Sequence, residues 1–257
     1  MFADAGTIGF FFLCFFFFEF YDTIKDCISA FKQGYRKSEN IESRKITREM
    51  IQEAMNNRTF GDFALTPAVV FFKDGDMVPS EGYKIEKRVM PGGHTQSRIV
   101  VSASAEKVLD IFDEFIALLG DTSSVVIEDF RTDTGDHVDN FAYYKDTYVV
   151  RSILLDFEDL LMNDGFIGLA IWSETAQAEV QLTRYKIIQI FARDTNPFER
   201  VLADFDIKED PELKFFFEHF YLLVSTEAGD SAVEALKDRL CIDQSVVQTG
   251  GPDIVYN

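Results

Sequence analysis

Two hydrophobic periods alternate along the chain. Short apolar runs bounded by turn residues predict β-strands, whereas longer segments with an apolar residue at every third or fourth position predict helices. Helices of this kind are predicted over 108–119 and 149–162, each followed by a glycine-containing turn. The predicted strands are 68–72, 83–89, 98–102, 124–130, 141–144, 166–172, 179–182 and 186–191.

The order of these elements predicts the fold class. Between residues 98 and 172 they follow as strand, helix, strand, strand, helix, strand, which is the order of the split β-α-β unit in ferredoxin-like folds. We therefore predict an α+β protein with a mixed or antiparallel sheet, helices on one face and a ferredoxin-like core. A three-layer α/β sheet is the alternative.

The C-terminal part is predicted to be helical. Asp210 followed by Pro211 is typical of a helix start, because proline is well tolerated in the first turn. Ser231 and Glu234 have the spacing of a capping box at the start of a further helix. The final residues contain two glycines and a proline, which indicates a tail without regular structure.

Changes in composition divide the chain into segments. A polar stretch of mixed charge over 36–48 is typical of a linker, and a Pro-Gly-Gly sequence at 91–93 separates two patterned regions. The predicted segments are a phenylalanine-rich leader with its linker at 1–45, a small N-terminal α/β unit at 46–92, an α+β core at 93–208, C-terminal helices at 209–245 and a tail at 246–257.

The leader has an unusual composition. Nine of the 27 phenylalanines lie in the first twenty residues, and 8–18 carries no charge. Beyond Glu19, apolar residues recur at helical spacing with basic residues between them, a pattern that suits a helix lying on an apolar surface. We expect peripheral membrane contact through residues 8–35; a buried helix or a start-site extension is the alternative. The leader lacks the basic start and small-residue cleavage site of a secretory signal.

Charge and cysteine content restrict the partners and the compartment. The net charge of −19 repels the phosphate backbone of nucleic acids, so we expect no nucleic-acid partner. Three cysteines without a C-x-x-C spacing predict neither a disulfide framework nor a zinc site. These features favour a cytoplasmic protein, associated with a membrane only through the leader.

Common catalytic motifs are absent from the sequence. It contains no phosphate-binding glycine loop, no G-x-S-x-G nucleophile elbow and no H-E-x-x-H metal motif. Its three histidines are far apart, so their spacing pairs none of them with a cysteine. The obvious classes of nucleotide-dependent and hydrolytic enzymes are therefore not indicated.

The stretch 128–140 is the strongest candidate for a metal site. It gathers carboxylates and an imidazole between a predicted strand and a predicted helix, and Mg²⁺ or Ca²⁺ prefers such oxygen ligands. It departs from the calcium-binding loop because Arg131 and Thr132 interrupt the alternation of acidic positions. A solvated acidic loop is the alternative interpretation. The candidate ligands are Asp129, Asp133, Asp136, His137 and Asp139.

A second pair of carboxylates lies on the second long predicted helix. Asp156 and Asp159 are three residues apart and therefore share one side of that helix. If both were buried, their pKa values would be pushed apart, which is how paired carboxylates divide acid and base roles. They are the catalytic candidates, and a solvated helix surface is the alternative.

Three functional hypotheses remain, of which the third is a small-ligand binding domain that requires a concave apolar pocket. The first is a non-enzymatic protein-interaction or regulatory module, because the surface is acidic and no catalytic motif is present. The second is a divalent-metal-dependent hydrolase that uses the acidic stretch. The second hypothesis requires several of the candidate ligands to converge on one point.

Overall fold

The computed structural model describes residues 48–73, 76–89, 95–131 and 137–248. The chain divides into two compact units, Met1–Arg44 and Lys45–Asn257, and all described residues belong to the second. The predicted leader, its membrane contact and the tail beyond residue 248 lie outside the described residues. No helix in the described part of the chain combines the length and hydropathy needed to cross a membrane.

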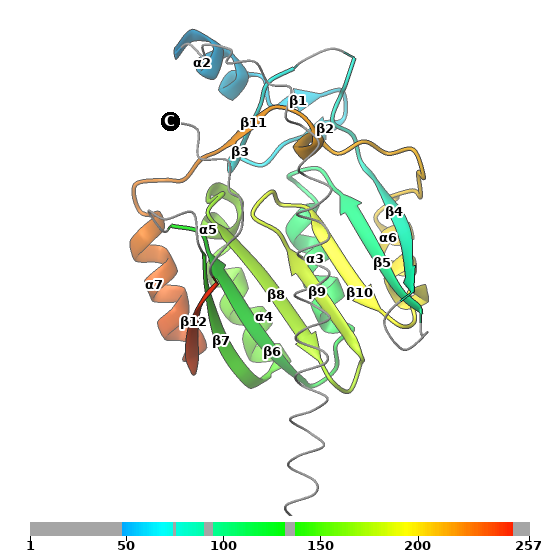
Figure 1. The fold of residues 1–257 in the computed structure, drawn as a ribbon, viewed down its shortest axis with the longest axis vertical. Helices are drawn as coiled ribbons and strands as arrows, with labels where there is room; N and C mark the ends of the chain where they lie inside the picture. The colour runs from blue at the N-terminus through cyan, green and yellow to red at the C-terminus, as the bar shows by residue number, and fades with distance from the viewer. Residues whose placement is uncertain (1–47, 74–75, 90–94, 132–136, 249–257) are drawn as a thin grey trace, which may run out of the picture. The chain divides into compact units, whose positions relative to one another are not determined.

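Eight strands form the main sheet (Figure 1), and every neighbouring pair in it is antiparallel. Short apolar runs within these segments, such as Val-Val-Ile in β6 and Ile-Gly-Leu-Ala-Ile in β8, are typical of buried strands. In spatial order they are β12 (Gln244–Gln248), β7 (His137–Asp146), β6 (Thr122–Asp129), β8 (Ile167–Ser173), β9 (Ala178–Leu182), β10 (Ile188–Ala192), β5 (Thr95–Ser102) and β4 (Gly82–Val89).

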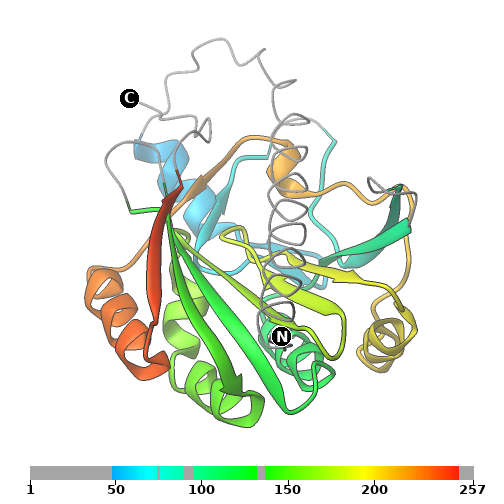
Figure 2. The ribbon, with the colours of Figure 1, turned by 60° about the horizontal axis from the view of Figure 1, so that its bottom comes forward.

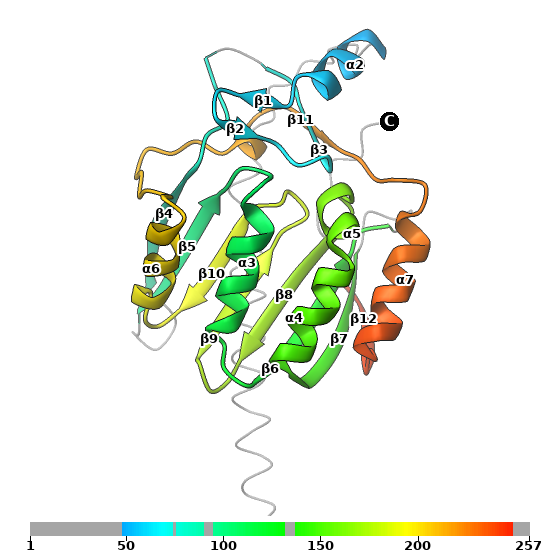
Figure 3. The same ribbon diagram turned by 180° about the vertical axis from the view of Figure 1, so that it is seen from behind.

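A layer of helices covers one face of this sheet, as Figures 2 and 3 show. The layer consists of α3 (Val108–Ala117), α4 (Thr147–Asp156), α5 (Glu158–Asn163), α6 (Asn196–Asp204) and α7 (Gly229–Leu240). The remaining elements lie beyond one end of the strands (Figures 1 and 3). They are α2 (Arg48–Asn56), the hairpin β1 (Thr59–Phe60) and β2 (Phe63–Ala64), the pair β3 (Val69–Phe71) and β11 (Tyr221–Leu223), and the 3-10 turn η1 (Phe216–Glu218).

The main core lies between the helices and the sheet. Alternate residues of each strand point into it, so that Ile127 on β6 and Ile171 on β8 are fully buried. From α3, Phe112 and Phe115 pack against them, and each such side chain contributes about 2 kcal/mol by leaving water. We call the other side of the sheet the opposite face.

The predicted α+β class, with an antiparallel sheet and helices on one face, is confirmed. The strand order differs from the predicted ferredoxin-like order, because β6 rather than β5 lies between β7 and β8. The β7 and β8 strands are parallel to each other with β6 between them, which is a split β-α-β unit. The other two strands joined by a helix, β5 and β6, are separated in the sheet by β8, β9 and β10. The β9–β10 hairpin lies between β8 and β5.

The C-terminal prediction is partly wrong. The chain after Pro211 forms η1 and then β11, which pairs with β3, instead of a long helix. The reason is that Phe215, Phe216 and Phe217 are all buried, and three consecutive residues cannot share one side of a helix. The capping-box residue Ser231 also lies within α7, whose N-cap is Ala228.

The start of α4 is fixed by a side-chain cap. The carboxylate of Asp146 accepts hydrogen bonds from the backbone N–H groups of Tyr148 (2.9 Å) and Val149 (3.1 Å). We expect Asp146→Ala to lower the free energy of unfolding by about 1 kcal/mol, measured by urea denaturation. Asp146→Asn should retain most of the stability, and an equal loss in both variants would contradict a capping role.

Candidate metal centre

The β6–β7 hairpin brings three potential metal ligands together. Glu128 on β6 is directly opposite Asp139 on β7, and His137 precedes Asp139 by two residues, so all three side chains are on the opposite face. One ligand atom of each residue lies within 4.8 Å of the others. His137 is buried, and the two carboxylates are half-buried.

Two carboxylates facing each other across a strand pair repel one another. A cation between them removes that cost. His137 already supplies one candidate, because its Nε2 lies 3.4 Å from Oδ1 of Asp139 and is charged only when the ring is protonated. A divalent ion would supply the charge without requiring a proton on His137.

Neighbouring residues restrict the geometry of this cluster. The ring of Phe130 stacks on His137 with 4.8 Å between ring centroids, and the guanidinium of Arg184 lies 4.4 Å from the centroid of Phe130. A Cβ atom at position 168 would lie only 2.5 Å from Oε2 of Glu128, so Gly168 leaves room for that carboxylate. The imidazole and one carboxylate are therefore positioned by packing.

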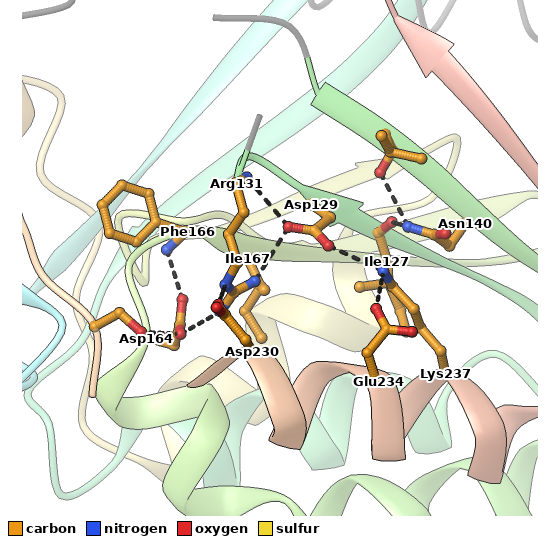
Figure 4. A network of polar contacts seen from close by, with 12 residues as sticks. Ile127, Asp129, Arg131, Asn140, Asp164, Phe166, Ile167, Asp230, Glu234 and Lys237 are labelled. Atoms are coloured by element: carbon orange, nitrogen blue, oxygen red, sulfur yellow. Dashed lines mark hydrogen bonds and ion pairs between the residues drawn. The ribbon is translucent and has the colours of Figure 1, made fainter. Parts of the chain in front are cut away.

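Asp129 lies on the helix-covered side of the sheet, away from the other candidate ligands. Its carboxylate accepts a hydrogen bond from Lys237 of α7 (3.0 Å) and pairs with Arg131 (3.1 Å), as Figure 4 shows. Burial raises the pKa of Asp129, but its contacts with Lys237 and Arg131 outweigh that effect and bring the pKa below the ordinary value. The carboxylate of Asp129 therefore forms structural ion pairs with Lys237 and Arg131.

Arg131 joins several elements at this end of the sheet (Figure 4). Its guanidinium contacts Asp129, the fully buried Asp164 at the end of α5, and Asp230 at the start of α7 (2.9 Å). Asp164 also accepts hydrogen bonds from Ser225 and from the backbone N–H of Phe166. These contacts tie α5, α7 and the end of β6 together.

Lys186, in the β9–β10 turn, is buried near this network. Its Nζ donates a hydrogen bond to the carbonyl of Ile167 (3.3 Å). Burial lowers the pKa of Lys186 to about 7, the charge of Asp164 opposes the shift, and Arg131 adds to it. A perturbed lysine of this kind can mark a functional site, but here the surrounding contacts are structural.

Of the other predicted site residues, Asp156 and Asp159 do not join the cluster. Asp156 is exposed and pairs with Arg239 of α7 (2.8 Å), and Asp159 is also exposed. Asp133 and Asp136 lie outside the described residues. In the described part of the chain, Glu128, His137 and Asp139 are the group whose ligand atoms converge.

Comparison with known proteins does not add a function to this geometry. No protein family, curated protein or solved structure matches the chain.

Glu128 is a candidate ligand that the sequence analysis did not select. Side chains alternate between the two faces of a strand, so His137 and Asp139 share one face. For the same reason, the adjacent residues Glu128 and Asp129 point to different faces. The signal was therefore present once 124–130 was predicted as a strand, but the pairing register that sets Glu128 opposite Asp139 comes only from the folded hairpin.

Proposed function

We propose that the protein binds one divalent metal ion through Glu128, His137 and Asp139. The observation that supports this is the convergence of two carboxylates and an imidazole from adjacent strands within 4.8 Å. Ligands in a tetrahedral metal shell lie roughly 3.4 Å apart. The pair formed by His137 and Asp139 already has this spacing, at 3.4 Å.

The ligand types favour particular ions. Mg²⁺ and Ca²⁺, which the acidic stretch suggested, prefer oxygen ligands alone, whereas an imidazole nitrogen beside two carboxylates suits Mn²⁺ or Zn²⁺. Three protein ligands leave coordination positions for water or a substrate oxygen. An ion held in this way would act as a Lewis acid, which is the chemistry required by the hydrolase hypothesis.

The proposal is tested by metal titration of the full chain after treatment with EDTA. We expect Mn²⁺ to bind with 1:1 stoichiometry by isothermal titration calorimetry, and the bound ion to change the Mn²⁺ electron paramagnetic resonance spectrum. Mn²⁺ is the better probe because Zn²⁺ also binds free thiols, and Cys241 is exposed. His137→Asn and Asp139→Asn should each weaken binding at least tenfold.

Asp159→Asn is the matched control, because Asp159 is an exposed carboxylate outside the cluster. It should bind Mn²⁺ as tightly as the unmodified chain. Equal affinity in the His137→Asn and Asp159→Asn variants would contradict the proposal, since it would place the ion elsewhere on this acidic protein.

A protein-interaction module is the second candidate function. Trp172 and Tyr143 favour it, because they are half-buried on the opposite face with 6.2 Å between their ring centroids. Trp and Tyr side chains are enriched among the residues that dominate binding energy at protein interfaces. This function does not require the metal ion.

A further inference from the structure

The outer side of α4 exposes large apolar side chains to solvent. Tyr148, Val149 and Leu155 of this ten-residue helix are exposed by 68%, 54% and 60%. Figure 3 shows α4 between α3 and α7, with its outer side turned away from the sheet. Single exposed apolar residues are normal on a protein surface, but a contiguous group of them indicates a binding surface.

These three side chains surround a small polar residue. Ser152 follows Tyr148 by four positions and Val149 by three, and it precedes Leu155 by three, so each of them is its neighbour on the helix. Ser152 is exposed as well. Tyr148, Arg151, Ser152 and Leu155 have the i, i+3, i+4, i+7 spacing of the four residues between which a packed helix inserts one side chain. We call Tyr148, Val149, Ser152 and Leu155 the α4 surface.

The charge around the α4 surface is negative. Arg151 of α4 and Arg239 of α7 each already pair with an aspartate, Asp113 (2.6 Å) and Asp156 (2.8 Å) respectively. Neighbouring elements add exposed carboxylates that form no ion pair within the described residues, namely Glu114 of α3 and Glu158 and Asp159 of α5. The charge of Glu114 acts on Arg151, because it adds to the effect of Asp113 in raising the pKa of that guanidinium. Complementary charge on a partner would therefore be positive.

Charge and spacing together select the occupant. A second copy of the chain carries the same net charge of −19, and anionic lipid surfaces are negative too, so the exposed carboxylates repel both. The spacing of the residues on α4 suits one helix that packs along it. A helix with apolar residues three and four positions apart, flanked by lysine or arginine, meets both requirements.

We infer that the α4 surface binds a basic amphipathic helix of a partner protein. One apolar side chain of that helix lies over Ser152, between Tyr148 and Leu155, and its basic residues face the carboxylates of α3 and α5. This inference rests on the interaction function named above and assigns it to a surface other than that of Trp172. It does not require the metal ion.

The test measures the fluorescence anisotropy of a fluorescein-labelled peptide titrated with the full chain, in EDTA and at about 0.15 M salt. The peptide has about 18 residues, with leucine at i, i+3, i+4 and i+7 and lysine elsewhere. We expect saturable binding that Leu155→Ser and Ser152→Gln each weaken at least tenfold. Ser152→Gln does not change the charge, so its effect reports the space that the partner needs. A peptide with glutamate in place of lysine should not bind.

Val247→Ser is the matched control, because Val247 is an exposed valine (61%) on β12 and not on α4. It should bind the peptide as tightly as the unmodified chain. Bound peptide should also slow hydrogen exchange of the backbone amides of α4, which locates the complex without any substitution.

Four results would overturn the inference. The first is no binding of the lysine peptide, and the second is equal affinity in the Leu155→Ser and Val247→Ser variants. The third is self-association of the chain that Leu155→Ser abolishes, since the occupant would then be a second copy. The fourth is a loss of binding in Trp172→Ala and not in Leu155→Ser, which would leave the interaction function in place at the opposite face.

Discussion

Arg131→Met is expected to lower the free energy of unfolding by about 3 kcal/mol, a shift of roughly 10 °C in melting temperature. The substitution removes the cation that contacts Asp164, whose side chain is only 1% exposed. A buried carboxylate left without its ion-pair partner is destabilising, even though Ser225 and the N–H of Phe166 still donate hydrogen bonds to it. Urea denaturation at pH 7 measures the loss.

Arg239→Met is the matched control for this prediction. Arg239 also pairs with an aspartate, but both partners are more than half exposed, and exposed ion pairs contribute 1 kcal/mol or less. An equal decrease in the free energy of unfolding in both variants would contradict the prediction. The contacts of Arg131 would then contribute no more than an exposed ion pair.

Glu179→Gln is expected to stabilise the protein by about 3 kcal/mol at pH 8 and to have little effect at pH 4. Glu179 is 2% exposed on the opposite face, between Trp172 and Phe191 on neighbouring strands. Burial raises the pKa of its carboxyl to about 7, although a hydrogen bond from Gln181 opposes the shift. Within the described residues, Oε2 of Glu179 has no hydrogen-bond partner.

The pH dependence follows from this raised pKa. Between pH 4.5 and 7 the folded protein retains a proton on Glu179 that the unfolded chain releases, so stability decreases as the pH rises through this range. Lys186 acts in the opposite direction, because its pKa is lowered from 10.5 to about 7 in the folded state. Its contribution to stability increases as the pH rises from 7 to 10.5.

These two groups therefore give the unmodified chain a minimum of stability near pH 7. We expect urea denaturation between pH 4.5 and 9 to show that the unmodified chain loses stability as the pH rises from 4.5 to 7. The Glu179→Gln variant should not show this loss. The exposed Glu174 provides a control, since Glu174→Gln should leave the decrease in place. Parallel pH profiles for all three chains would exclude Glu179 as the cause.

Most of the sheet could be predicted from hydrophobic pattern alone. The strands that became β6 and β8, and the helix that became α3, have strong periodicity and short turns between them. The predicted helix at 149–162 is two helices in the structure, which meet at Phe157, where the backbone leaves the helical conformation. The pattern contains no signal for that break, because both helices bury the same kind of apolar residue.

The candidate site was only partly predictable. His137 and Asp139 could be selected from their residue types, but Asp129 was grouped with them because sequence proximity does not distinguish the two faces of a strand. The edge strand β12 was divided between the predicted C-terminal helices, which ended at 245, and the predicted tail. Five residues of mixed polarity carry little strand signal until β7 offers a pairing partner.

The position of β12 protects the strand that carries two of the candidate metal ligands. It pairs with β7 from His137 to Phe141, and Ser245 donates a hydrogen bond to Asn140 (2.9 Å). Without β12, the backbone of β7 would be the unpaired margin of the sheet, open to other extended chains and free to fray beside His137. Removal of β12 would therefore act directly on the backbone that positions the imidazole of His137.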